Sequence, residues 1–212
     1  MTRTAFFVDG FNLYHSLLAA SRAMGGAGTR WLDLRALCGS LLYRIGGGAQ
    51  ATRVAYFTAL AHHLDATSPQ TTKRHRVYLT CLKDSGVEIH LGHFKRAEAR
   101  CPHCTRRVAR HEEKETDVAI GVSLLEGFVR DTCDVAVLVT GDSDQAPAVR
   151  KTLELFPQRR VFVCFPFDRV SDELRQVASG HFGVSAGQYS IHQFPDPFVT
   201  RSSREIRKPE GW

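Results

Sequence analysis

The sequence predicts an α/β fold, a three-layer α/β/α sandwich whose central sheet is mainly parallel. Apolar runs that suit buried strands alternate along the chain with segments of helical apolar spacing, the order expected when helices cover both faces of a parallel sheet. The length of 212 residues suits one such domain and is too short for two ordinary ones. Residues 1–194 are therefore expected to form a single domain, followed by a loosely ordered basic tail at 195–212.

Six strands are expected from apolar, β-branched or alternating runs. Residues 4–8 are apolar after Thr4 and do not alternate, which is typical of a strand covered on both faces. The run at 52–60 is rich in strand-forming residues, and 87–91 alternates over a short length. The last three expected strands are residues 134–140, 160–165 and 189–192.

Six helices are expected from apolar side chains spaced three or four residues apart. Their ranges are 11–23, 33–43, 71–85, 116–130, 143–155 and 171–179. Thr116 suits the N-cap of the fourth helix, and Pro147 fits the fifth because it falls near the first turn. The expected apolar face of the fourth helix consists of Val118, Val122, Leu125 and Val129.

Four acidic residues lie at ends of these elements: Asp9, Asp117, Asp142 and Asp144. Asp9 ends the first strand, Asp142 and Asp144 follow the strand at 134–140, and Asp117 begins a helix. Parallel sheets bind ligands outside the carboxyl ends of their strands, so we expect the four carboxylates to converge there. Their mutual repulsion would be relieved by a divalent cation, and carboxylate oxygens suit Mg²⁺ or Mn²⁺. Asn12 is expected to orient a ligand or water beside them.

Each acid taken alone has a simpler explanation. Aspartate commonly caps helices, and Asp9-Gly10 suits an ordinary turn. Two separate strands that both end in acid are harder to explain by capping, and this favours the metal site.

The positive charge of the chain is concentrated at residues 93–111. This segment holds six Lys/Arg and one Glu, so it contributes +5 of the net charge of +6. A basic loop next to Asp117 would supply phosphate contacts to RNA or DNA, and a solvated, mobile loop is the alternative. The candidate nucleic-acid-binding residues are Arg96, Arg100, Arg106, Arg107, Arg110 and Lys114. Stacking of bases would need aromatic side chains from elsewhere, for which the candidates are Tyr14, Trp31 and Tyr56.

Cys101 and Cys104 form a Cys-x-x-Cys pair that His93 and His111 flank. A Cys₂His₂ zinc site is one interpretation, but redox pairs and free thiols use the same cysteine spacing. No secretory signal and no apolar segment of membrane-spanning length is found, so we expect a cytoplasmic protein with reduced thiols and no membrane contact. The sequence does not set the oligomeric state, and a homodimer is compatible with it.

Three motifs resemble those of the NYN domain, in its LabA-like bacterial branch of the PIN-like nuclease class. They are Phe7-Val8-Asp9-Gly10-Phe11-Asn12-Leu13-Tyr14, Glu113-Lys114-Glu115-Thr116-Asp117-Val118 and Thr140-Gly141-Asp142-Ser143-Asp144. The resemblance covers residues 4–165 and implies a PIN-like sandwich, metal binding by Asp9, Asp117, Asp142 and Asp144 with Asn12 beside them, and Mg²⁺- or Mn²⁺-dependent cleavage of RNA. Gln145 departs from the family pattern, which often has an aromatic or aliphatic residue after the last acid.

The function expected from these features is that of a metal-dependent ribonuclease, in which a cation-activated water attacks the phosphodiester. The alternative is a non-catalytic RNA- or DNA-binding module with a vestigial acidic site, although such a site has no physical reason to retain the repulsion. A phosphatase of the haloacid type is disfavoured because its chemistry needs a second Asp where this chain has Phe11. No glycine-rich phosphate loop with a following lysine is present.

Overall fold

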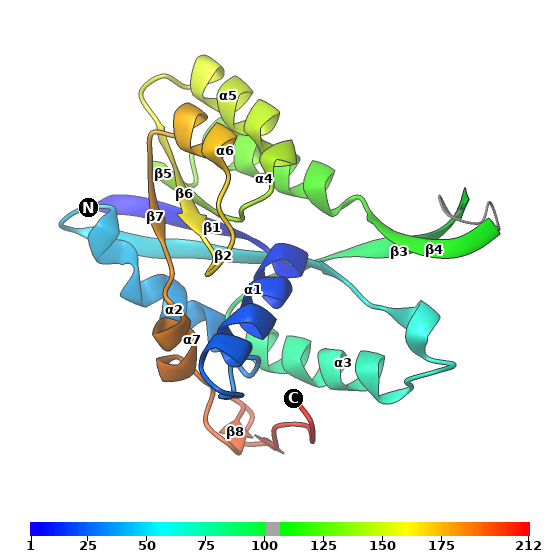
Figure 1. Cartoon of the computed structure of the whole chain (residues 1–212). Helices are drawn as coiled ribbons and strands as arrows, with labels where there is room; N and C mark the ends of the chain where they lie inside the picture. The colour runs from blue at the N-terminus through cyan, green and yellow to red at the C-terminus, as the bar shows by residue number, and fades with distance from the viewer. Residues whose placement is uncertain (101–106) are drawn as a thin grey trace.

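The computed structural model describes residues 1–100 and 107–212 and contains a seven-stranded sheet in the order β4-β3-β2-β1-β5-β6-β7 (Figure 1). The strands are β1 (Thr2–Asp9), β2 (Ala49–Ala59), β3 (Glu88–Arg100), β4 (Arg107–Lys114), β5 (Val135–Val139), β6 (Arg160–Phe165) and β7 (Gly180–Gly183). In this order, every neighbouring pair is parallel except one: β4, at the edge, pairs antiparallel with β3. The mainly parallel sheet is therefore confirmed.

Helices cover both faces of the sheet, which confirms the three-layer architecture (Figure 1). One face packs against α1 (Gly10–Ala23), α2 (Leu34–Ser40), α3 (Gln70–Asp84) and α7 (Ala186–Ile191). The other face packs against α4 (Thr116–Val129), α5 (Ala146–Leu155) and α6 (Asp172–Val177). Single 3₁₀ turns occur at Leu42–Arg44, His62–Leu64 and Ser143–Gln145. In the part of the chain that is described, no helix combines the length and apolar character needed to cross a bilayer.

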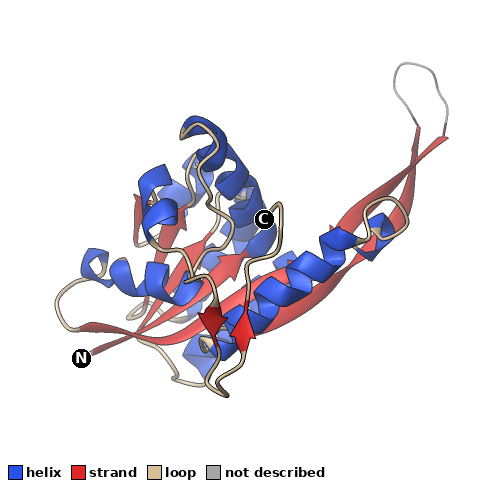
Figure 2. Cartoon of the chain, turned by 90° about the horizontal axis from the view of Figure 1, so that it is seen from below, coloured by secondary structure: helices blue, strands red, loops and turns tan. Residues whose placement is uncertain are grey.

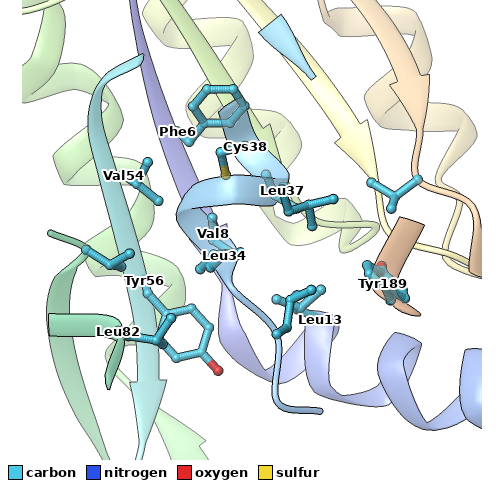
Figure 3. Packing of buried hydrophobic residues seen from close by; sticks show 14 of the residues in the cluster. Phe6, Val8, Leu13, Leu34, Leu37, Cys38, Val54, Tyr56, Leu82 and Tyr189 are labelled. Atoms are coloured by element: carbon cyan, nitrogen blue, oxygen red, sulfur yellow. The ribbon is translucent and has the colours of Figure 1, made fainter. Parts of the chain in front are cut away.

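The central strand β1 explains why its sequence lacks polar alternation. Phe6 and Val8 face the layer of α1, α2 and α3, while Ala5 and Phe7 face α4 and α5, and all four are at most 1% exposed. Figure 3 shows Phe6 and Val8 among leucines of the first of these layers. A strand with helices on both faces must be apolar at every position, as this run is.

The direction in which the chain winds through the sheet reverses at β1. Strands β2 and β3 are added on one side of β1, and β5, β6 and β7 on the other. Loops at the carboxyl ends of β1 and β5 therefore leave in opposite directions, and the space between them is where open α/β sheets bind ligands. Asp9 and Asp142 come from these two strand ends.

The buried face of α4 differs from the expected one. Ile120, Leu124 and Phe128 are buried, whereas Val118 and Val122 are 70% and 61% exposed. The helix has two apolar stripes, and the one with the larger side chains packs against the sheet because it buries more apolar area. Gly127 lets this stripe approach closely, since a Cβ there would lie 3.4 Å from the ring of Phe7.

The basic segment at 93–111 was expected to be a loop after a short strand, and this was wrong. Residues on both sides of the undescribed stretch belong to a long antiparallel hairpin of β3 and β4, in which His93 pairs with Lys114 and Arg96 with His111. Figure 2 shows this hairpin extending well beyond the body of the domain. Because the hairpin leaves the core, its sequence lacks the apolar alternation of a half-buried strand.

The C-terminal segment also differs from the expectation of a strand followed by a loose tail. Residues 189–192 largely belong to helix α7, which Ser185 and Gln188 cap reciprocally. The tail at 195–212 forms a two-stranded ribbon of β8 (Phe198–Val199) and β9 (Glu205–Ile206). Phe198 and Ile206 are 9% and 8% exposed and join the core cluster under α3. These apolar side chains, together with hydrogen bonds such as that from the Arg201 N–H to Asp84, hold the tail on the domain.

Replacing Phe198 by Ala should lower the free energy of unfolding by about 3 kcal/mol because a buried aromatic ring is removed. Val199→Ala is the matched control on the same strand, since Val199 is 56% exposed, and should change stability by less than about 0.5 kcal/mol. Urea unfolding measures both. Equal, negligible effects of the two substitutions would show that the tail is not packed.

Candidate metal centre

Asp9 is the last residue of β1 and the N-cap of α1, and both oxygens of its carboxylate are held. Oδ1 accepts a hydrogen bond from the backbone N–H of Asn12 at 2.9 Å, and Oδ2 accepts one from the Thr140 hydroxyl at 2.8 Å. The side chain is buried, with 6% of the residue exposed. Asp9 therefore does cap a helix, and it does so while facing the end of the neighbouring strand β5.

The loop after β5 is fixed against the start of α1. The backbone N–H of Gly141 donates to Oδ1 of Asn12 at 3.0 Å, and that of Asp142 donates to the Thr140 hydroxyl at 3.1 Å. A Cβ on Gly141 would lie 2.9 Å from backbone and side-chain carbons of Arg169, so glycine is required for this close approach. Asn12, expected to orient a ligand or water, holds this loop through its side-chain oxygen.

Three of the four expected acids converge at this edge of the sheet. Asp9, Asp117 and Asp142 each offer a carboxylate oxygen, and these oxygens all lie within 4.8 Å of one another. Asp117 reaches the group from the first turn of α4 and is exposed to solvent. We call these three residues the acidic trio.

Asp144 does not join the acidic trio among the described residues. Its side chain is exposed, and its backbone N–H donates to Oδ1 of Asp142 at 3.0 Å. Its charge still reaches Asp117, whose pKa it helps to raise. Asp144 is thus a neighbour of the trio that shapes its electrostatics.

The carboxylates of the trio disfavour one another's charged forms. Burial raises the pKa of Asp9 to about 6, with further contributions from the charges of Asp117 and Asp142, against the lowering effect of its hydrogen bonds. Burial and the charge of Asp142 also raise the pKa of Asp117. No ion pair between described residues involves the trio. Three converging carboxylates without a cationic side chain fit a divalent cation.

Gln145 contacts the trio, a role the sequence did not reveal. It is 1% exposed, and its Nε2 donates to Oδ1 of Asp117 at 3.2 Å and to the backbone oxygen of Asp117 at 3.3 Å. Its Oε1 is buried without a hydrogen-bond partner. The departure of Gln145 from the family pattern was the available signal, because a buried amide in place of an apolar side chain needs a polar partner.

Of the aromatic candidates for base stacking, only one is accessible. Trp31 and Tyr56 are 2% and 5% exposed and belong to the core, so they cannot stack on a base. Tyr14 is 41% exposed on α1. Phe11, not among the candidates, is 49% exposed on the same helix, two residues after Asp9.

The residues expected to bind nucleic acid on the basic segment are only partly described. Arg96 and Lys114 are exposed on β3 and β4. Arg106 lies outside the described residues, and so do the side chains of Arg100, Arg107 and Arg110. Lys114, the last residue of β4, lies three residues before Asp117 in the chain, so the hairpin leads directly into the helix that carries Asp117.

The expected zinc ligands are not brought together by the described residues. Cys101 and Cys104 lie outside them. Nδ1 of His93 lies 3.1 Å from Oε2 of Glu115, and the ring of His111 stacks on His63 with centroids 4.2 Å apart.

The sequence profile of the NYN domain matches residues 3–185, most of the chain. This chain belongs to the NYN domain family. The family is generally nuclease-like and implies nucleic-acid substrates, and the acidic trio could hold a metal ion.

Two individual proteins resemble this NYN protein over most of its length. The 6-hydroxy-3-succinoylpyridine 3-monooxygenase HspA of Pseudomonas putida (strain DSM 28022 / S16) is 27% identical over 245 aligned positions, covering 99% of this chain and 75% of that protein. A crystal structure of a protein of unknown function from Vibrio parahaemolyticus RIMD 2210633 superposes with a TM-score of 0.55 at 17% identity, covering 87% of this chain and 93% of the other. The second likeness supports the α/β fold described above.

The raised pKa of Asp9 predicts how stability depends on pH when no metal is present. The folded state holds the Asp9 proton more tightly than the unfolded state, so stability from this group is lost as pH rises from about 4 through about 6. A shift of about two units corresponds to roughly 3 kcal/mol. Urea unfolding in EDTA at pH 5 and 7.5 should show a smaller pH difference for Asp9→Asn than for wild type. Identical pH differences would contradict the raised pKa.

Proposed function

We propose that this NYN protein is a divalent-metal-dependent ribonuclease. The observation that supports this most is the convergence of Asp9, Asp117 and Asp142 within 4.8 Å at the point where the winding of the sheet reverses. The trio would hold Mg²⁺ or Mn²⁺, the cations that carboxylate oxygens suit. When bound there, such an ion supplies an activated water and neutralises charge on the phosphate.

The protein's own residues position the carboxylates. Thr140 and the N–H of Asn12 hold both oxygens of Asp9, so this carboxylate does not rotate when substrate binds. Gln145 plays the same part for one oxygen of Asp117. Lys114 and Arg96 on the hairpin would bind phosphates on either side of the cleaved bond, with the remaining arginines of the segment. RNA as the preferred substrate, and a reducing cytoplasmic location in keeping with four buried free cysteines, belong to the same proposal.

The name of the Pseudomonas putida relative supplies a second candidate, hydroxylation of a pyridine ring. The identity of 27% over nearly the whole chain is the observation in its favour. Iron sites that activate oxygen commonly combine two histidines with one carboxylate, whereas the acidic trio offers three carboxylates, a set better suited to Mg²⁺ or Mn²⁺. We therefore rank the nuclease first. Hydroxylation of 6-hydroxy-3-succinoylpyridine, assayed directly, separates the two.

A non-catalytic nucleic-acid-binding module is the third candidate. Such a protein gains nothing from an Asp9 whose pKa is raised by burial and by its acidic neighbours, because the buried, repelled charge lowers stability. In an enzyme, the same carboxylates would bind the catalytic cation, which explains why the loss of stability is tolerated. Turnover of RNA distinguishes the enzyme from the module.

Asp142→Asn and Asp9→Asn should each reduce Mn²⁺-dependent cleavage of a labelled RNA by at least about 100-fold, because each removes a ligand charge from the trio. Asp172→Asn is the control, an exposed aspartate paired with Arg175 on α6, and should cleave like wild type. Asp144→Asn should have a smaller effect than Asp142→Asn. Absence of cleavage by wild type with either metal, or normal cleavage by both trio variants, would refute the nuclease.

Gln145→Leu should weaken Mn²⁺ binding by roughly tenfold, because residues that orient metal ligands commonly contribute that much. Titration calorimetry with Mn²⁺ measures this without any substrate. Gln176→Leu, an exposed glutamine on α6, is the matched control. Unchanged Mn²⁺ affinity in Gln145→Leu would show that its hydrogen bond to Asp117 does not position the ligand.

A further inference from the structure

A cavity of about 240 Å³ lies between the 3₁₀ turn after β2 and the base of the β3/β4 hairpin. Its walls combine apolar groups with imidazoles: Leu60, Leu91, Phe94, His62, His63 and His93. None of these residues belongs to the acidic trio. We call this space the histidine pocket.

The rings around the histidine pocket are arranged as stacking surfaces. His63 and His111 lie face to face, with centroids 4.2 Å apart and planes inclined by 9°. The ring of Phe94 meets His63 edge-on at 4.7 Å. His111 is exposed on β4, so its outer face is open to a further flat group. Flat aromatic faces beside cations are how proteins bind single-stranded nucleic acid without reading its sequence.

One polar atom in the histidine pocket has no partner. Nδ1 of His63 is buried and makes no hydrogen bond. The neighbouring His62 is engaged with Asp65 at 3.1 Å, and His93 with Glu115 at 3.1 Å. Buried polar groups usually have a hydrogen-bond partner, so the unpaired Nδ1 of His63 sets this ring apart among the described residues of the pocket.

The histidine pocket is adjacent to the acidic trio. Asp9 and His90 both pair with Phe57 across the sheet, and the pocket begins at Leu60, just past the end of β2 and three residues, or about 10 Å, beyond Phe57. At its floor, a Cβ on Gly92 would lie 2.7 Å from the backbone oxygen of Lys114 and 3.5 Å from Oγ1 of Thr116, the residue before Asp117. An RNA chain with one phosphate bound at the acidic trio would therefore reach the histidine pocket within one or two nucleotides.

We infer that the histidine pocket is a base-binding subsite that stacks an unpaired nucleobase of single-stranded RNA beside the cleavage site. The inference rests on the proposed nuclease function. The exposed Lys95 and Arg96 on β3 provide the charge to hold the flanking phosphates. A metal ion is the less suitable occupant, because among the described residues only the acidic trio brings three ligand atoms within 4.8 Å of one another.

Binding of a short single-stranded RNA carrying 2-aminopurine, measured by fluorescence in EDTA so that no cleavage occurs, tests the subsite. Wild type should quench the probe at one position of the oligonucleotide. His63→Ala should abolish this quenching and weaken binding at least about fivefold. His63→Phe keeps a ring but not the nitrogen, so it should retain the quenching and lose less affinity than His63→Ala. His181→Ala removes an exposed imidazole on β7, at the opposite edge of the sheet, and should behave like wild type.

His111→Ala is a second test in case His63→Ala does not fold. Because His111 is exposed, its replacement should reduce quenching without lowering the melting temperature. Wild-type binding and quenching in both His63→Ala and His111→Ala would overturn the subsite. Equal losses in His63→Phe and His63→Ala, or binding that appears only with added Zn²⁺, would overturn stacking. If wild type cleaves RNA with Mn²⁺ yet the alanine variants bind normally, the subsite alone fails. If wild type cleaves RNA with Mn²⁺ but binds none in EDTA, the subsite fails and the nuclease stands; if it neither binds nor cleaves RNA, both proposals fail.

Discussion

The repulsion among Asp9, Asp117 and Asp142 is the constraint around which this edge of the fold is organised. Burial and neighbouring charge together raise the pKa of Asp9 to about 6, so the trio costs stability near neutral pH unless a cation is present. The surrounding hydrogen bonds hold the carboxylates together despite that cost. Thr140 bridges Asp9 and the loop of Asp142, and Asn12 ties the same loop to α1.

The sequence predicted the features that depend on local pattern. Asp9 and Asp142 were recognisable because each follows an uninterrupted apolar run, and a parallel sheet brings the carboxyl ends of such runs to one edge. The alternation of strand and helix predicted the three layers, because helices that connect parallel strands must cover the faces of the sheet. Asp117 was identified from its place at a helix start, although its position beside Asp9 depends on how α4 packs across the sheet.

Features that depend on contacts between distant segments were missed or misjudged. Both sides of α4 are apolar, so periodicity could not tell Val118 from Ile120. The hairpin of β3 and β4 is solvated and so lacks an apolar signature. The tail is held by contacts with distant segments, among them the burial of Phe198 and Ile206 and the hydrogen bond from the Arg201 N–H to Asp84. The contact of Gln145 with Asp117, and the stacking of His63 on His111, join residues 28 and 48 positions apart that no local pattern links.

The central claim is that the acidic trio binds one divalent cation. A crystal soaked in Mn²⁺ tests this directly, through the anomalous scattering of manganese. The account predicts a single strong peak within coordination distance of oxygens from Asp9, Asp117 and Asp142. Well-ordered carboxylates with no peak between them, or with an arginine side chain in the place of the ion, would contradict it.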